Sequence, residues 1–220
     1  MELELPDLPF FPHILLGNDP QESDSQILEN AYKFLDSGIS MAKIKLGRRT
    51  PHQEKKLISA IANLFLEKKI KAPFLRFDGN RRLISADLHT IIENIDPHWI
   101  NYIEEPFVFN NEMNEWIEFQ KLTGIGLALD EILVQEWALS IAQEKWPVIP
   151  QEWAVKALII KPPLLGGFMA AIKVMNWAHQ QNLMGIISNV SHDPKETWEC
   201  KLLSLMQNRK VFTPSGIFAP

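Results

Sequence analysis

The stretch INYIEEP, from Ile100 to Pro106, combines a short apolar run with two adjacent acids, and this combination indicates the fold of the chain. Its apolar residues predict a short buried β-strand, and Pro106 marks the point where such a strand stops. Glu104 and Glu105 therefore lie side by side at the strand end. Acids are common where strands meet water, but the strands of α/β barrels also carry active-site residues at their ends. The polar residues at the ends of the other predicted strands distinguish between these two interpretations.

Similar apolar runs alternate with segments of helical spacing along the whole chain. The predicted strands cover residues 13–18, 41–47, 74–80, 100–106, 125–131, 155–162, 183–189 and, more weakly, 210–216. Helical spacing is clearest at residues 24–37, 51–69, 112–122 and 167–181. This alternation predicts parallel βαβ units, which an open doubly wound sheet or a closed barrel could use. The strand count favours an α/β, parallel (β/α)7β TIM-like barrel that forms a single domain over residues 1–220.

Composition and charge restrict the class of protein. The 220 residues are 46% hydrophobic and 22% charged, which is typical of a globular domain. A formal net charge of −5 offers no basic field for nucleic acid, and no apolar run reaches the ~18 residues of a membrane span. The amino terminus lacks the basic region of a signal peptide, and the single Cys200 suits a reducing compartment. We therefore expect a cytoplasmic protein that binds neither nucleic acid nor membranes.

Polar residues interrupt the predicted strands toward their carboxyl ends. They are Lys43 and Lys45, Asp78 and Asn80, Glu104 and Glu105, Asp130 and Glu131, and Lys161. Twenty-six residues separate Asp78 from Glu104 and also Glu104 from Asp130, which is one βα repeat each. Because the carboxyl ends of barrel strands share one face, we expect these side chains to meet there.

The two lysines of the second predicted strand are expected on one face. Lys43 and Lys45 are two residues apart, and side chains alternate along a strand. A parallel barrel strand is buried on both sides, so an ammonium group there is costly unless it is paired or partly neutral. The alternative places one lysine on the surface rim and pairs the other with an acid.

Asp78, Glu104 and Asp130 are expected to converge from three adjacent strands. Three carboxylates without a cation would repel one another and raise one another's pKa values. A bound divalent ion would remove that repulsion, and all-oxygen ligands favour Mg²⁺, with Mn²⁺ as a substitute. For any single acid, helix capping or a salt bridge at the rim remains the alternative.

Five motifs at these strand ends occur together in one order. They are KIK at 43–45, DGN at 78–80, EEP at 104–106, LDE at 129–131 and KPPLLGG at 161–167. The set resembles the barrel domain of the enolase superfamily, within it the muconate-lactonising subgroup, and most narrowly the o-succinylbenzoate synthase family of menaquinone biosynthesis. The resemblance runs from about residue 12 to the end of the predicted strand 183–189.

The resemblance implies a metal-binding site and a catalytic role for each of Lys43, Lys45 and Lys161. It implies that Asp78, Glu104 and Asp130 are the ligands of Mg²⁺. Glu105 would point to the opposite side of its strand and would not be a ligand. The resemblance also implies that Lys45 is the base that removes a proton next to a substrate carboxylate. Lys43 would then be the nearby cation that lowers the pKa of Lys45. Lys161 would be the cation that stabilises the anionic intermediate.

The implied activity is that of a carbon–oxygen lyase acting on a small-molecule carboxylate. In the o-succinylbenzoate synthase family proton abstraction is followed by syn dehydration, in which one lysine is base and then acid. Racemases, epimerases and cycloisomerases of the same subgroup share the first step and remain open as alternatives. The segment at 211–220 contains no acid, unlike the last strand of the epimerases, and this favours the dehydratase.

Three further residues are weaker candidates for substrate binding. Asn80 could orient a ligand or only bond to a loop, and a strand-end hydrogen bond would explain Ser188 equally well. Gly166 precedes a helix whose amino end could bind an anion, but a tight turn explains it too. The six histidines lack metal-ligand spacing and are expected on the surface or in loops.

The chain departs from the resembled family ahead of the lysine pair. Too few residues precede Lys43 for the amino-terminal capping domain of the superfamily, so we expect the barrel alone. A catalytically impaired, truncated barrel is therefore an alternative. Apolar surface left uncovered could promote self-association, or a separate capping domain could cover it.

Overall fold

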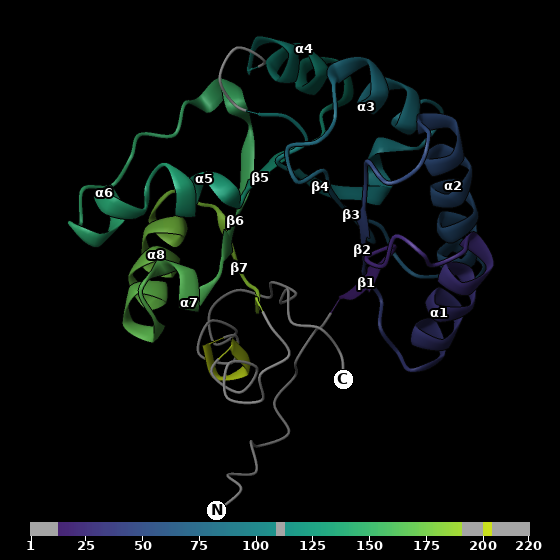
Figure 1. The fold of residues 1–220 in the computed structure, drawn as a ribbon, viewed down its shortest axis with the longest axis horizontal. Helices are drawn as coiled ribbons and strands as arrows, with labels where there is room; N and C mark the ends of the chain where they lie inside the picture. Colours follow the sequence, from purple (N-terminus) through teal and green to yellow (C-terminus); the bar gives the residue numbers. More distant parts are fainter. Residues whose placement is uncertain (1–12, 109–112, 191–199, 204–220) are drawn as a thin grey trace, which may run out of the picture.

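The central feature of the molecule is a curled sheet of seven parallel strands (Figure 1). The computed structural model describes residues 13–108, 113–190 and 200–203. The strands pair in sequence order, each with the next. They are β1 (Ile14–Leu16), β2 (Ala42–Lys45), β3 (Leu75–Asp78), β4 (Ile100–Glu104), β5 (Leu127–Leu129), β6 (Val155–Ile160) and β7 (Met184–Ile187). All carboxyl ends therefore lie at one edge of the sheet.

Helices connect the strands and cover the outer side of the curl (Figure 1). They are α1 (Asp24–Asp36), α2 (Pro51–Glu67), α3 (Ser85–Ile92), α4 (Met113–Thr123), α5 (Glu131–Gln135), α6 (Ala138–Ala142), α7 (Pro162–Leu165) and α8 (Phe168–Gln180). Two short 3₁₀ helices, η1 (Pro97–Trp99) and η2 (Gln151–Trp153), precede β4 and β6. Among the described residues, none of these helices has the length and apolar character needed to cross a bilayer.

The first two long helices begin where their sequences provide caps. Ser23 and Gln26 form a capping box at the start of α1, and Thr50 and Gln53 form another at α2. In each box the hydroxyl accepts from a backbone N–H that the helix itself cannot satisfy. Pro51 occupies the first turn of α2, where its missing N–H costs nothing.

The sheet buries a different layer on each of its faces. The outer layer packs against the helices and contains most of the core, including the fully buried Phe77, Leu127 and Trp116. The inner layer is small and consists of Tyr102, Ala128, Ala157, Ile159 and Ile186, with Met184 packed against it. Lys43, Asp78 and Glu104, near the carboxyl ends of their strands, lie on this inner face and contact one another.

The fold class predicted from the sequence is confirmed, with the parallel order of βα units that TIM barrels have. The weak strand at 210–216 lies outside the described residues. Not every connection is the expected single helix. Between β5 and β6 lie α5 and α6, of five residues each, and η2, and between β6 and β7 lie α7 and α8.

Helix α8 covers most of the segment whose spacing predicted a helix at 167–181. Its buried residues are Ala171, Val174, Trp177 and Ala178. Phe168, Ile172 and Met175 pack at the margin of the core and are only partly buried. The small alanines let α8 lie close to the strands, which a count of large apolar residues does not reveal.

Candidate active site

The candidate active site gathers at the carboxyl ends of β2 to β6. In the register of the sheet, Lys45 lies beside Asp78, and Asp78 lies beside Glu104. Asp130 follows β5 directly, and Lys161 follows β6. The convergence predicted from the repeat spacing is therefore present in the structure.

Lys43 joins two of the acids below the strand ends. Its Nζ lies 2.7 Å from Glu104 Oε1 and 2.8 Å from Asp78 Oδ2, and both acids are fully buried. Burial alone would lower the pKa of Lys43, but the charges of Asp78 and Glu104 outweigh it and raise the pKa well above its usual value. Lys43 is thus a buried ammonium group that is paired with acids, as the cost of burying it requires.

Lys45 lies one step nearer the strand ends and has two acceptors. Its Nζ lies 2.5 Å from Asp78 Oδ2 and 2.8 Å from Asn80 Oδ1. The Nδ2 of Asn80 donates in turn to Glu131 Oε1, at 3.0 Å. Asn80 therefore contacts the predicted base, and the DGN and LDE motifs are joined through this side chain.

Lys161 pairs with the third acid on the far side of the cluster. Its Nζ lies 2.5 Å from Asp130 Oδ2. Burial would lower the pKa of Lys161, but the charges of Asp130 and Glu104 raise it above its ordinary value. At neutral pH Lys161 is accordingly a cation.

The acids differ in how readily they take up a proton. Burial would raise the pKa of Asp78, but Lys43 and Lys45 beside it lower the pKa well below the usual range. Burial and then the negative charge of Asp78 raise the pKa of Glu104 well above its usual value. Of two carboxylates that share Lys43, Asp78 retains its charge more firmly.

The acids of the cluster have lysine side chains beside them. The side chains of Lys43, Lys45 and Lys161 contact the three acids Asp78, Glu104 and Asp130. The repulsion expected among the carboxylates is only partly offset by the lysines, because burial and then the negative charges of Asp78 and Asp130 raise the pKa of Glu104. As the described side chains lie, no group of three or more His, Cys, Asp or Glu residues could hold a metal ion.

The chemistry of the donor set nevertheless fits a hard divalent cation. Glu104 Oε2 and Asp130 Oδ1 are buried and have no hydrogen-bond partner. An unpaired buried carboxylate oxygen is costly, and Mg²⁺ prefers such oxygens. Asp78, Glu104 and Asp130 each have one oxygen that no lysine contacts, and these oxygens could hold the ion once the side chains turn toward one another.

A second polar group, which we did not predict from the sequence, lies on the inner face beside Lys43. Arg76 is fully buried on β3, where its Nη1 lies 3.0 Å from His13 Nδ1 and its guanidinium lies 4.9 Å from the ring centre of Tyr102. Burial and then Arg76 lower the pKa of His13 well below its usual value, while burial raises the pKa of Tyr102 to about 12. His13 lies outside a helix or strand, just before β1, as the expectation of surface or loop positions for the histidines allows, but it is buried.

The sequence contains a pattern that could have predicted the positions of Arg76 and Tyr102. Arg76 precedes Asp78 by two residues on an otherwise apolar strand. This is the same alternation that placed Lys43 and Lys45 on the inner face. Tyr102 bears the same relation to Glu104 on the next strand.

The remaining candidates contact other parts of the molecule. Glu105 points away from the lysines, as expected, and burial raises its pKa to about 7. Ser188 follows β7, and its hydroxyl donates to the carbonyl of Asn189. Gly166 ends α7 with φ of 100°, a left-handed conformation that suffices to explain the glycine. Substrate contacts for Ser188 and Gly166 stay predictions.

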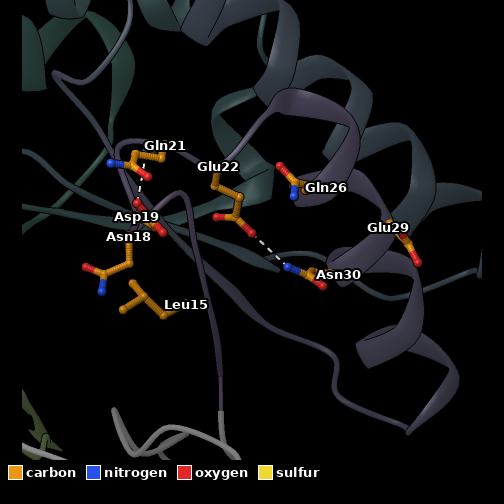
Figure 2. Close-up of a pocket in the computed structure, with 8 residues that line it drawn as sticks. All are labelled: Leu15, Asn18, Asp19, Gln21, Glu22, Gln26, Glu29 and Asn30. Carbon is orange, nitrogen blue, oxygen red and sulfur yellow. Dashed lines mark hydrogen bonds between the residues drawn. The ribbon is translucent and has the colours of Figure 1, made fainter.

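A polar cavity of about 670 Å³ is lined by residues apart from the cluster (Figure 2). It is bounded by the end of β1 and by α1, and Glu22 Oε1 accepts from Asn30 Nδ2 across it at 2.7 Å. Its lining residues are Leu15, Asn18, Asp19, Gln21, Glu22, Gln26, Glu29 and Asn30. None of them belongs to the lysine–carboxylate cluster.

The family is decided by the extent of the match to a family model. Residues 26–211 match the model described as Enolase C-terminal domain-like, which covers every strand from β2 to β7 and all residues of the cluster. The chain belongs to this family. The superfamily predicted from the five motifs is thereby confirmed.

Relatives of this Enolase C-terminal domain-like chain include metabolic enzymes. It is 31% identical to the o-succinylbenzoate synthase of Aliivibrio salmonicida over 156 residues, which are 70% of this chain and 43% of that protein. It is 29% identical over 172 residues to the chloroplastic protein PHYLLO of Arabidopsis thaliana, covering 76% of this chain and 9% of that protein. The chain spans less than half the length of these relatives.

Solved structures of the superfamily share the fold. MenC from Desulfotalea psychrophila superposes with a TM-score of 0.68 at 18% identity, over 97% of this chain and 55% of that one. The L-Ala-D/L-Glu epimerase from Bacillus subtilis superposes with a TM-score of 0.69 at 15% identity, over 95% and 54%. The fold therefore accommodates several reactions, and it does not choose among them.

Proposed function

We propose that this chain is the barrel of a Mg²⁺-dependent enzyme that removes a proton next to a substrate carboxylate. More narrowly, we propose a dehydratase of the o-succinylbenzoate synthase type, a carbon–oxygen lyase of menaquinone biosynthesis. The observation that carries the proposal is the position of Lys45, whose Nζ is held by Asp78 and Asn80 at the strand ends. The opposite side of the cluster is formed by Lys161 and Asp130.

Lys45 is suited to act as the base. After Lys45 has lost a proton, its two remaining N–H groups can still donate to Asp78 and Asn80. The nitrogen lone pair then points away from both acceptors and can take the α-proton of a substrate. The side chain is positioned for proton transfer by two contacts that persist through the step.

Lys161 and Lys43 are suited to different roles. As a cation, Lys161 can donate hydrogen bonds to the negative charge that develops on the substrate carboxylate. Lys43 is too deeply paired to reach a substrate and instead adds positive charge beneath Lys45. Asp78, Glu104 and Asp130 would hold Mg²⁺, which when bound supplies Lewis-acid stabilisation of that negative charge.

The dehydration itself needs a single lysine in two roles. Lys45 takes the α-proton as the C–H bond breaks, and then returns it to the departing hydroxyl as the C–O bond breaks and water leaves. Both events occur on one face of the substrate, so no second base is required. A mechanism with one base fits this site, because nearby acids raise the pKa values of Lys43 and Lys161 and keep both side chains cationic.

The similarity to o-succinylbenzoate synthases at about 30% identity supports the dehydratase over other reactions. A racemase, epimerase or cycloisomerase remains the second candidate, because Lys45 and Lys161 flank the site from different strands and could act on opposite substrate faces. We also propose cytoplasmic action on a small carboxylate, without nucleic acid or membrane. A separate capping domain or self-association would cover the strand ends.

The experiment is to incubate the chain with Mg²⁺ and the cyclohexadiene precursor and to follow formation of o-succinylbenzoate. We expect product that depends on Mg²⁺ and a loss of ~10²–10⁴-fold in rate for Lys45→Met. Lys173→Met is the matched control, because Lys173 also pairs with an acid at 2.5 Å but on the exposed surface. Absence of product, even with a capping domain supplied in trans, would refute the dehydratase, and substrates of the epimerases would then test the second candidate.

A further inference from the structure

Glu105 is a buried acid whose contacts lie outside the lysine cluster. It is fully buried at the end of β4, next to Glu104, and its backbone has φ of 23°, which non-glycine residues seldom adopt. Consecutive side chains of a strand point to opposite faces, and the two glutamates do so here. Glu104 faces Lys43, whereas Glu105 faces the start of α5.

The carboxylate of Glu105 accepts from three donors. Its Oε1 lies 2.7 Å from the backbone nitrogen of Asp130 and 3.0 Å from that of Ile132. Its Oε2 lies 2.5 Å from Arg81 Nε, and Arg81 also pairs with Glu136 at 3.0 Å. Both oxygens are therefore used, and one of them holds the first turn of α5 (Glu131–Gln135).

This arrangement has a consequence for Asp130, which occupies the N-cap position of α5. An aspartate there ordinarily folds its side chain back to cap the helix. Asp130 makes no such bond. Its Oδ2 pairs with Lys161 and its buried Oδ1 has no hydrogen-bond partner, while Glu105 accepts from the N–H groups that need a partner.

We propose that Glu105 is a positioning residue that caps α5 from the neighbouring strand and so leaves the Asp130 carboxylate available to a divalent ion. The inference rests on the proposed function, because it assumes that Asp130 is a metal ligand. The two glutamates of EEP then have distinct roles, since Glu104 is a ligand and Glu105 directs the ligand of the next strand. Residues that orient ligands typically change metal affinity by ~10–100-fold when they are replaced.

The test compares two double variants that differ only in the acceptor. Glu105→Gln with Arg81→Met removes the buried ion pair but keeps an amide oxygen that can face both N–H groups. Glu105→Met with Arg81→Met has the same charge and a similar volume but no such oxygen. Mg²⁺ affinity, measured by calorimetry at about pH 8, is expected within ~3-fold of wild type for the first and ~10–100-fold weaker for the second.

Stability measurements separate positioning from a purely structural role. A structural cap would lower the free energy of unfolding of the methionine variant and leave the Mg²⁺ affinity of its folded form unchanged. Equal Mg²⁺ affinity of the two double variants would overturn the inference while wild-type binding still supported the proposed function. A wild-type chain that binds no Mg²⁺ would overturn both.

A shorter acid keeps the test decisive if the methionine variant does not fold. Glu105→Asp retains a charge opposite Arg81 but withdraws the carboxylate from α5 by one methylene. We expect it to fold and to bind Mg²⁺ about 10-fold more weakly than wild type. Wild-type affinity in Glu105→Asp would contradict the inference.

Discussion

Lys43 and Glu104 form an ion pair in the interior of the curled sheet, with Nζ 2.7 Å from Oε1 and Glu104 fully buried. The same ammonium group lies 2.8 Å from Asp78, so that one cation serves two acids. The remaining oxygen of Glu104 has no hydrogen-bond partner. The site thus combines a satisfied salt bridge with an unsatisfied acceptor, and removing either charge should have measurable effects.

Lys43→Met should lower the free energy of unfolding by about 3–5 kcal/mol in the absence of divalent ions, because it leaves buried carboxylates without their cation. Urea denaturation measures this change. Added Mg²⁺ should restore stability more in the variant than in wild type, since it replaces the lost positive charge. Lys173→Met, which breaks an exposed pair, should change stability by less than about 1 kcal/mol. Equal effects for both variants would contradict this account of the pair.

Asn80→Leu should lower kcat more than it raises KM. The leucine is close in size but removes the acceptor at 2.8 Å that holds Lys45, so the base loses its fixed position. Misplacing a catalytic group by about 1 Å can cost ~10²-fold in rate. Initial-rate kinetics on the dehydratase substrate separate the two constants.

Glu131→Gln is the companion variant for the same contact. Its amide oxygen can still accept from Asn80 Nδ2, so we expect kcat within about 3-fold of wild type. A large loss in Glu131→Gln together with normal rates in Asn80→Leu would mean that Glu131 acts directly rather than through Asn80.

The sequence predicted the cluster because strand alternation and repeat length are local properties. Lys43 and Lys45 had to share a face, and the equal steps from Asp78 to Glu104 and to Asp130 had to bring the acids to one edge. The predicted pairing of buried lysines with acids is confirmed by the contacts of Lys43.

The parts that could not be predicted depend on directions in space. Which oxygen of an acid contacts a lysine is set by side-chain torsions, which the sequence does not show. The contacts of Glu105 with the start of α5 and with Arg81 depend on how the loops after β4 and β5 are placed. The burial of His13 was not predicted, because its partner Arg76 lies 63 residues away in sequence.

Trp116→Phe should reduce the free energy of unfolding by about 1–3 kcal/mol. Trp116 is fully buried, and its Nε1 donates to the carbonyl of Trp153 at 2.8 Å, joining α4 to η2. Phenylalanine keeps most of the packing against Phe119 but leaves that carbonyl without this donor. Denaturant unfolding measures the loss, and Leu122→Ala, at a position 78% exposed on the same helix, should stay within about 0.5 kcal/mol of wild type.

His13 should make the fold lose stability as the pH falls below about 6.5. Burial and then Arg76 lower the pKa of His13 in the folded state, whereas the unfolded chain has the ordinary value of ~6.5. Between these two values only the unfolded state binds the proton. The contribution is therefore complete above pH ~6.5 and is lost as the pH falls toward the folded pKa, at up to ~1.4 kcal/mol per pH unit.

The difference between wild type and His13→Gln isolates this effect from other titrations. Glu105 acts in the opposite direction, because burial raises its pKa to about 7, so its contribution is present at low pH and lost as the pH rises through 7. Glutamine keeps an acceptor for Arg76 but does not titrate. Urea unfolding at several pH values between about 7.5 and 5 should show wild type losing stability relative to His13→Gln below pH ~6.5. If the free energies of unfolding of wild type and His13→Gln changed in parallel with pH, His13 would have the same pKa in the folded and unfolded states. That result would contradict the prediction.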